Sequence, residues 1–280
     1  SAQYLLACAY TDGTLGLDMD EDLALLWLQK AAEGGHGKAQ YFLGCAYEDG
    51  EIGLDVNLKN ALLWLQKAAD GGQGDAQSKI GSAHVHGSLE LDVDKKLALF
   101  WLQKAADGGQ GEAQWSLGRA YLGGGFLGLD ADEKLAHFWI HKSADGGQGE
   151  AQYFLGVAYE HGDCLGLDVN LETALEMYQR AAEGGDGDAQ YKLSKAYNGG
   201  NLGGGPLGLD ADQEKASEWL YKAAEGGCSD AVETVEWFES IGRYCDFCMR
   251  PEQVCDDSAV LCGKPLWAIR WRNEYPWACY

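Results

Sequence analysis

Apolar residues along the first 240 positions of this 280-residue chain recur with the period of an α-helix, in two kinds of short segment that alternate. In residues 39–50 the apolar positions fall at i, i+4, i+7 and i+8, and they are Ala39, Leu43, Ala46 and Tyr47. In residues 60–72 they fall at i, i+3, i+4 and i+7, and they are Ala61, Trp64, Leu65 and Ala68. Because small and large residues alternate on these faces, we expect the two helices to approach closely and to interlock.

The two segments belong to an internal repeat. Residues 65–77 read LQKAADGGQGDAQ, and residues 102–114 repeat these letters with one conservative change. The dipeptide Ala-Gln marks each unit, at positions 2, 39, 76, 113, 151 and 189, and Ala231 continues the series. The intervals are 37, 37, 37, 38, 38 and 42 residues. A single helix pair cannot bury its apolar face alone, so units of this kind stack on their neighbours.

The predicted helix ends are also repeated. An Asp or Asn precedes every second helix, where its side chain suits the N-cap position, and the column consists of Asp20, Asn57, Asp94, Asp132, Asn170 and Asp212. Paired glycines such as Gly71-Gly72 suit the left-handed conformation after a helix. The segment LQKAADGGQGDAQ is therefore the junction between units, where one helix ends, the chain turns and the next helix begins.

A column of large residues runs through the second helices. We align it as Trp27, Trp64, Trp101, Trp139, Tyr178 and Trp219. This column predicts that most of the ten tryptophans pack in the core and do not stack on a cofactor.

The unit A-x-x-x-L-G-x-A-Y-x-x-G … L-G-L-D … A-x-x-W-L-x-K-A-A-x-G-G resembles the Sel1-like repeat, a relative of the tetratricopeptide repeat. The resemblance covers residues 2–242, as six units plus a seventh leading helix over residues 230–241 that caps the array. It departs at His84, which replaces a tyrosine, and at Ser194, which replaces a glycine. The resemblance implies an all-α, right-handed solenoid, a superhelix of antiparallel helix pairs, that acts as an adaptor or scaffold for protein complexes. We therefore divide the chain into a repeat region, residues 1–242, and a Cys- and Trp-rich C-terminal extension, residues 243–280.

Charge narrows the choice of partners. The net charge is −23, and residues 1–240 hold 16 of the 21 Lys and Arg but 39 of the 44 Asp and Glu. Nucleic acid is excluded as a partner because phosphate contacts need clustered basic residues. The acidity is explained either by a solvated face or by a protein partner with a basic surface. No run approaches the roughly 18 uncharged apolar residues that a membrane span needs.

Comparison of the units separates constant columns, which build the stack, from variable ones. The most variable row of the first helices has the spacing i, i+4, i+7 and lies away from the packed face. In the family that this repeat resembles, first helices line the concave surface. We therefore expect a partner-binding groove there, with the anchors Tyr41, Trp115, Arg119, Tyr153, Tyr191 and Lys195. The alternative is that these side chains only cover neighbouring helix turns.

The cysteines do not pair unit by unit, as a disulfide framework requires, so we expect a soluble protein of a reducing, intracellular compartment. Five of the nine lie in the C-terminal extension. A structural zinc would be held there by four thiolates, Cys245, Cys248, Cys255 and Cys262, a spacing similar to the start of a MYND-type zinc finger. The second C-x-x-C and the histidine of that module are missing, so ordinary thiols are the alternative.

Aromatic residues of the extension stand outside the repeat. Trp267, Trp271 and Trp277 lie in a nearly neutral segment with little periodicity. Such a segment either folds over the end of its own solenoid or docks into a neighbouring subunit of a larger assembly.

No motif for catalysis is visible: the chain lacks G-x-S-x-G, a Walker sequence and a dinucleotide fingerprint. His137 and His141 have metal-chelating spacing, but His137 occupies a column of leucines, which favours packing. We predict a non-catalytic scaffold or adaptor without a cofactor, acting as a peripheral subunit of a larger assembly. The alternatives are a hydrolase, as proposed for cysteine-rich Sel1 proteins, and a zinc-binding regulatory adaptor.

Overall fold

The computed structural model describes residues 2–123, 127–162, 165–199, 207–241, 244–245 and 250–251. The first helices of the repeats are α1 (Ala2–Asp12), α3 (Gly37–Asp49), α5 (Gly74–His86), α7 (Gly111–Gly123), α9 (Gly149–His161) and α11 (Gly187–Asn198). The second helices are α2 (Glu21–Glu33), α4 (Leu58–Asp70), α6 (Lys95–Asp107), α8 (Glu133–Asp145), α10 (Leu171–Glu183) and α12 (Gln213–Glu225). A last helix, α13 (Ser229–Ile241), follows. The described residues up to 241 contain no strand, which confirms the predicted all-α class with six helix pairs and one further helix.

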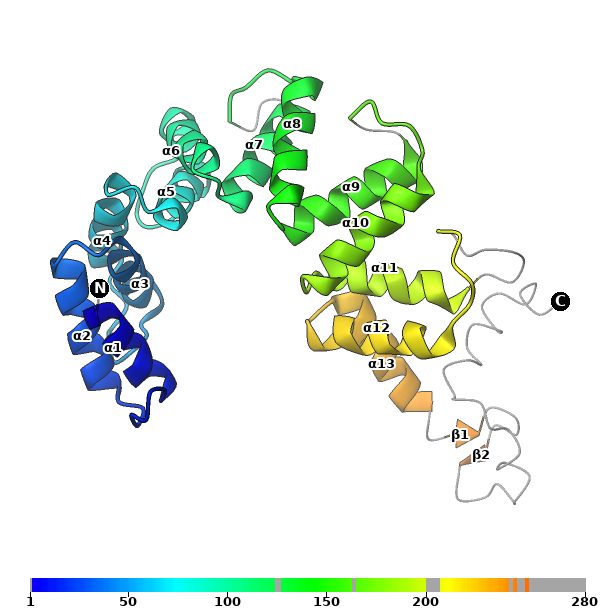
Figure 1. The fold of residues 1–280 in the computed structure, drawn as a ribbon, viewed down its shortest axis with the longest axis horizontal. Helices are drawn as coiled ribbons and strands as arrows, with labels where there is room; N and C mark the ends of the chain where they lie inside the picture. The colour runs from blue at the N-terminus through cyan, green and yellow to red at the C-terminus, as the bar shows by residue number, and fades with distance from the viewer. Residues whose placement is uncertain are drawn as a thin grey trace. The chain divides into compact units, whose positions relative to one another are not determined.

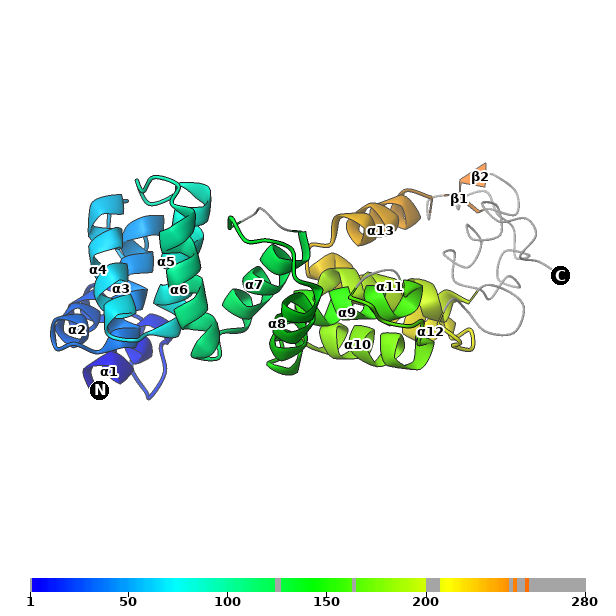
Figure 2. The ribbon, with the colours of Figure 1, turned by 90° about the horizontal axis from the view of Figure 1, so that it is seen from above.

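The helices form two compact units, which we describe separately. Unit 1 is Ser1–Gly146 with α1 to α8, and unit 2 is Gly147–Tyr280 with α9 to α13. Inside each unit every helix packs on the helix before it and the helix after it, as Figures 1 and 2 show. Successive packing of helical hairpins is the architecture of a solenoid, so the predicted repeat fold is confirmed.

The predicted C-terminal extension is described in four residues only. They form the strands β1 (Tyr244–Cys245) and β2 (Arg250–Pro251), which pair antiparallel with Tyr244 opposite Pro251. The division of the chain at residue 242 stays a prediction, because residues 252–280 lie outside the described part.

Side-chain caps begin the second helices, as the sequence predicts. Asp20 Oδ1 accepts a hydrogen bond from the Leu23 amide at 2.9 Å, and the other five members of the Asp/Asn column cap their helices in the same way. Each cap is worth roughly 1 kcal/mol. At the other end, Gly72 has φ +87°, the left-handed conformation that glycine adopts without strain.

Each hairpin is closed by a backbone hydrogen bond. The amide of the N-cap residue donates to a carbonyl near the end of the first helix, for example from Asn57 to Tyr47 at 2.7 Å and from Asp94 to His84 at 3.0 Å. Because a backbone carbonyl makes this bond, His84 can replace the usual tyrosine of this column. The bond places the end of the first helix beside the start of the second, so the pair runs antiparallel.

In the second to fifth hairpins the two helices touch at a glycine. A Cβ atom added at Gly44 would lie 2.7 Å from Leu65 Cγ, and one added at Gly156 would lie 2.7 Å from two ring carbons of Tyr178. Atoms cannot approach that closely, so glycine is needed for this helix–helix distance. In the last hairpin Ser194 takes the glycine position and is itself buried.

The predicted column of large residues is wrong at Tyr178. Tyr178 faces Gly156 as Leu65 faces Gly44, so it belongs to the column of Leu65, and its neighbour Met177 stands in the tryptophan column. The predicted core role of the tryptophans also holds only in part. Trp101 and Trp139 are buried, whereas the remaining members of the column, Trp27, Trp64 and Trp219, are half-buried. Each of these five rings carries a lysine ammonium within 5.0 Å of its centroid.

The glutamines of four Ala-Gln pairs link neighbouring repeats, a role that the sequence analysis missed. Gln77 Nε2 donates to the carbonyl of Ala69 at 3.0 Å, and Gln190 Nε2 donates to the carbonyl of Ala182 at 2.9 Å. Gln40 and Gln114 make the same bond. Carbonyls in the last turn of a helix have no partner within the helix, so this side chain satisfies one of them at each of these four junctions. None of the helices in the described residues is long and apolar enough to cross a membrane.

Candidate partner-binding surface

The six residues predicted to anchor a partner in the groove, here called the first-helix stripe, lie on α3 and α7 in unit 1 and on α9 and α11 in unit 2. They are Tyr41, Trp115, Arg119, Tyr153, Tyr191 and Lys195. All four aromatic side chains are half-buried, and the two cations are exposed. The stripe therefore combines rings held by packing with charges that face solvent.

Tyr41 packs against the core of the following repeat, on a cluster that includes Ala76 and Ile80. Its ring centroid lies 5.6 Å from that of Phe42, in an edge-on arrangement. Burial raises the pKa of Tyr41 above its ordinary value, and the neighbouring Cys45 raises it further. Tyr41 is thus a neutral phenol with part of its surface already covered by α5.

Arg119 lies over Trp115 on α7. The guanidinium carbon is 5.7 Å from the centroid of the indole ring, a cation–π contact between residues one helical turn apart. Contacts of this kind hold a long side chain near one orientation, so less conformational entropy is lost when a partner binds.

In unit 2, Tyr153 packs against Tyr178, with ring centroids 5.6 Å apart. Burial raises the pKa of Tyr153, and the charge of Asp188 adds to the effect. On α11, the Tyr191 hydroxyl lies 3.3 Å from Thr234 Oγ1, and Lys195 Nζ lies 4.0 Å from the Tyr191 ring centroid. Lys195 on Tyr191 is thus the counterpart of Arg119 on Trp115.

Both interpretations of the stripe from the sequence keep some support. The aromatic rings do cover neighbouring turns, because Tyr41, Tyr153 and Tyr191 all pack on the next helix or core cluster. The exposed cations above two of the rings retain the composition of an interface anchor. That the stripe binds a partner stays a prediction.

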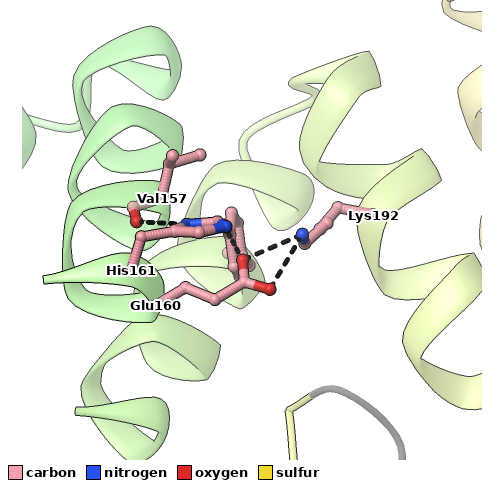
Figure 3. A network of polar contacts seen from close by, with 5 residues as sticks. Val157, Glu160, His161 and Lys192 are labelled. Carbon is pink, nitrogen blue, oxygen red and sulfur yellow. Dashed lines mark hydrogen bonds and ion pairs between the residues drawn. The ribbon is translucent and has the colours of Figure 1, made fainter. Parts of the chain in front are cut away.

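A polar network behind the stripe in unit 2 was missed by the sequence analysis. The buried Tyr178 on α10 donates its hydroxyl proton to Glu160 on α9, with 2.7 Å between the oxygen atoms. Lys192 on α11 lies 2.8 and 3.0 Å from the two carboxylate oxygens of Glu160 (Figure 3). His161 Nδ1 lies 3.0 Å from the carbonyl of Val157 beside this network. The network joins three helices of two repeats.

The network shifts the pKa values of its members. Burial alone would raise the pKa of Glu160, but the hydrogen bonds from Lys192 and Tyr178 outweigh it and hold the pKa below its ordinary value. Burial raises the pKa of Tyr178, and the carboxylate of Glu160 raises it further. Glu160 is therefore an anion and Tyr178 a neutral donor at neutral pH.

Unit 1 contains the same ion pair in the same repeat columns. Lys79 on α5 lies 2.9 Å from Glu48 on α3. Among the six units only Glu48 and Glu160 are acidic in one column, and only Lys79 and Lys192 are basic in the other. This covariation inside one chain is the signal that would have predicted both pairs.

The remaining predicted site residues fall almost entirely outside the described residues. Of the four cysteines predicted to hold zinc, Cys245 lies in β1, while Cys248, Cys255 and Cys262 lie outside, as do Trp267, Trp271 and Trp277. The zinc site and the docking role of the tryptophans stay predictions. In the parts that the structure does describe, no group of three or more His, Cys, Asp or Glu is placed to hold a metal.

The paired histidines of α8 face each other. The ring centroids of His137 and His141 are 4.1 Å apart. Burial lowers the pKa of His141, and the charge of His137 lowers it further, so its neutral form is favoured. This is consistent with the packing role that the sequence favours for the pair.

The repeats match a known family in both sequence and structure. A family model described as the Sel1 repeat matches six consecutive segments, residues 1–36, 37–73, 74–110, 111–148, 149–186 and 187–228. The chain belongs to the Sel1 repeat family. Sel1 repeat proteins generally mediate protein–protein interaction, and the Sel1 repeat fold is typically a non-enzymatic scaffold.

Solved Sel1 repeat structures resemble this chain over most of its length. A Sel1 repeat protein from Oxalobacter formigenes is 34% identical with a TM-score of 0.66, covering 79% of this chain and 84% of that chain. The protein c5321, a protective antigen present in uropathogenic Escherichia coli strains, is 28% identical with a TM-score of 0.64, covering 98% of this chain and 53% of that one. The immunity protein PA5088 from Pseudomonas aeruginosa, at 20% identity and a TM-score of 0.55 over 80% of this chain and 82% of that chain, shares the fold. No curated protein matches this chain.

Proposed function

We propose that this Sel1 repeat protein is a non-catalytic scaffold that binds a protein partner through the first-helix stripe, as a peripheral subunit of a larger assembly. The observation that carries the proposal is the exposed cation held over a half-buried aromatic ring on α7 and again on α11. Arg and aromatic residues are enriched among the residues that dominate binding energy at interfaces. The family context supports a protein partner.

The charge of the chain sets a second requirement for the partner. At a net charge of −23, long-range attraction favours a partner whose overall surface is basic. Arg119 and Lys195 are basic residues within this acidic chain. Each can donate hydrogen bonds to a carboxylate on the otherwise basic surface of the partner. They lie on different repeats, Arg119 in unit 1 and Lys195 in unit 2.

The test is affinity purification with mass spectrometry, using the stripe variant Arg119→Glu/Lys195→Glu. A matched control is Lys30→Glu/Lys222→Glu, because these exposed lysines also lie over aromatic rings, at 4.7 Å from Trp27 and 4.5 Å from Trp219, but on second helices. We expect the wild type and the control to capture the same proteins, and the stripe variant to lose them. Equal capture by the stripe variant, with unchanged circular dichroism, would contradict the proposal.

A further inference from the structure

Three successive second helices of unit 1 carry the same pattern, a lysine, an apolar residue and a lysine at four-residue intervals, and all of these residues are exposed except the half-buried Lys142. The pattern is Lys59, Leu63 and Lys67 on α4, Lys96, Phe100 and Lys104 on α6, and Lys134, Phe138 and Lys142 on α8. Residues at i, i+4 and i+8 lie on one face of a helix. We call these nine residues the Lys–apolar–Lys stripe. It is separate from the first-helix stripe, which lies on other helices.

The apolar members of this stripe are unusually exposed. Leu63, Phe100 and Phe138 expose 50%, 56% and 52% of their surface. Single exposed apolar residues are common, but here the same column is apolar and exposed in three consecutive repeats. Leu97 and Leu135, one turn earlier on α6 and α8, are exposed at 43% and 39% and add to the exposed apolar surface of these helices.

Among the described residues, none of the six lysines of the stripe has a carboxylate partner, whereas Lys79, Lys192, Lys215 and Lys222 do make ion pairs. Lys67 Nζ instead lies 4.1 Å from the Trp64 ring centroid, and Lys104 and Lys142 lie 5.0 Å from Trp101 and Trp139. These ring contacts hold the ammonium groups beside Leu63, Phe100 and Phe138 without neutralising them.

Unit 2 shows that packing does not require this pattern. The same columns read Glu172, Glu176 and Arg180 on α10, and Glu214, Glu218 and Lys222 on α12. On α12, Lys222 lies 2.7 Å from Glu218, so the residue four positions earlier neutralises the lysine. In unit 1 an apolar residue stands at that position, and the charge is left for another molecule.

We propose that the Lys–apolar–Lys stripe of unit 1 docks an acidic amphipathic segment of a partner protein, a helix whose apolar face is flanked by Asp and Glu. Its apolar side chains cover Leu63, Phe100 and Phe138, and its carboxylates pair with the six lysines. Amphipathic helices are bound in this way by apolar surfaces that span several turns. Charge complementarity of this kind also directs the partner to unit 1 rather than to the acidic columns of unit 2.

An anionic membrane is disfavoured as the occupant of the stripe. Asp70, Asp107 and Asp145 lie one turn beyond the last lysine of each helix, on the same face, and all three are exposed. Together with the net charge of −23 they oppose approach to a negative bilayer. A protein segment can place its own basic or neutral groups opposite these aspartates.

The probe for this surface is a fluorescent helical peptide of about 20 residues, with leucines on one face, glutamates along both edges of that face and neutral glutamines elsewhere, titrated with the full chain in an anisotropy assay. The first variant is Lys59→Glu/Lys96→Glu/Lys134→Glu. Unit 2 carries Glu172 and Glu214 at this position, and glutamate suits the first turn of a helix, so the fold is retained. The second variant is Leu63→Glu/Phe100→Glu/Phe138→Glu, which copies Glu176 and Glu218.

We expect the wild type to bind the peptide and added salt to weaken the binding. Each triple variant is expected to lose about tenfold or more in affinity. The control Lys30→Glu/Lys222→Glu, outside both stripes, is expected to bind the peptide as the wild type does. The peptide assay alters no residue of the first-helix stripe, so failure of the proposed function and failure of this proposal are distinguishable. A peptide with lysine in place of every glutamate is expected not to bind.

Four results would overturn the proposal. The first is no binding by the wild type up to about 1 mM. The second is equal affinity of the wild type and both triple variants. The third is binding to phosphatidylserine-containing vesicles, but not to the peptide, that the triple variants lose. The fourth is self-association of the wild type in sedimentation that the triple variants abolish, because a second copy would then be the occupant.

Discussion

Two junctions between repeats use the same ion pair but support it differently. Glu48 and Lys79 in unit 1 are 2.9 Å apart, and Glu160 and Lys192 in unit 2 are 2.8 Å apart. The second-helix core residue behind the first pair is Leu65. Behind the second pair it is Tyr178, whose hydroxyl donates to Glu160.

The difference shows how a repeat array accepts a polar group in its core. The side chain of Glu160 is 11% exposed, against 24% for Glu48. A more buried carboxylate needs more donors, because removing it from water costs free energy that one cation does not fully offset. Tyr178 supplies that donor, and Glu160 in turn satisfies the buried hydroxyl.

The largest expected loss of stability comes from truncating the core residue behind each ion pair. Tyr178→Ala should lower the free energy of unfolding by about 3–5 kcal/mol and Leu65→Ala by about 2–5 kcal/mol. Tyr178→Ala should cost more because it also removes a hydrogen bond. Urea unfolding followed by circular dichroism measures both, with the exposed Phe100→Ala as a control near zero. A smaller loss at position 178 than at position 65 would contradict the added stabilisation by the Tyr178 hydroxyl.

The next effect separates the two cations. Lys192→Met should lower the free energy of unfolding by about 2–3 kcal/mol, because it leaves a nearly buried carboxylate without its cation. Lys79→Met should cost about 1 kcal/mol, because water reaches Glu48 more easily. The same unfolding experiment compares the variants. Equal losses would mean that the difference in burial between the two carboxylates has no energetic consequence.

A third experiment isolates the hydroxyl that unit 1 lacks. Tyr178→Phe should cost about 1–2 kcal/mol, since it removes one hydrogen bond to a charged group and leaves the ring in place. Combined with Glu160→Gln in a double-mutant cycle, it should show a coupling free energy clearly above zero. Tyr153→Phe, which keeps the neighbouring ring, is the matched control. If the losses of unfolding free energy from Tyr178→Phe and Glu160→Gln simply add, the hydrogen bond between Tyr178 and Glu160 contributes no stability.

The smallest effect is a pH dependence at Glu160. Its pKa is lowered in the folded chain from an ordinary value of 4.5, so the unfolded chain binds this proton more readily. The stabilisation is therefore complete above the ordinary pKa and is lost as the pH falls through the lowered folded value. Urea unfolding from about pH 7 to about pH 3 should show the difference between wild type and Glu160→Gln shrinking at the acid end. A difference that grows toward acid pH would reverse the assignment.

Most of the fold could be predicted because the repeat gives each helix boundary several independent observations. The cap column from Asp20 to Asp212 and the turn at Gly71-Gly72 depend on short-range backbone chemistry, which is the same in every unit. Tyr178 was misplaced because a large aromatic residue beside Met177 resembles the tryptophan column. Only its contact with Gly156 shows which of the two adjacent positions points into the hairpin.

The candidate surfaces were predictable to different degrees. The variability of one column among the units predicted that Arg119 and Lys195 are exposed, and the structure places both at the surface. The same comparison of units did not predict the network of Glu160, Tyr178 and Lys192. Tyr178 is 18 residues and Lys192 is 32 residues from Glu160 in the chain. Such contacts depend on how one repeat stacks on the next, and no local period encodes them.

The sequence by itself determined the helical hairpins, their caps and their number, because spacing and turn chemistry act within a few residues. Only the tertiary structure decided which side chains are buried between repeats and which remain for a partner. Burial depends on the neighbouring hairpin, as the packing of Tyr41 against the core cluster of the following repeat shows, whereas Lys104 beside Phe100 is left exposed. The same residue types therefore serve the core in one repeat and the surface in another.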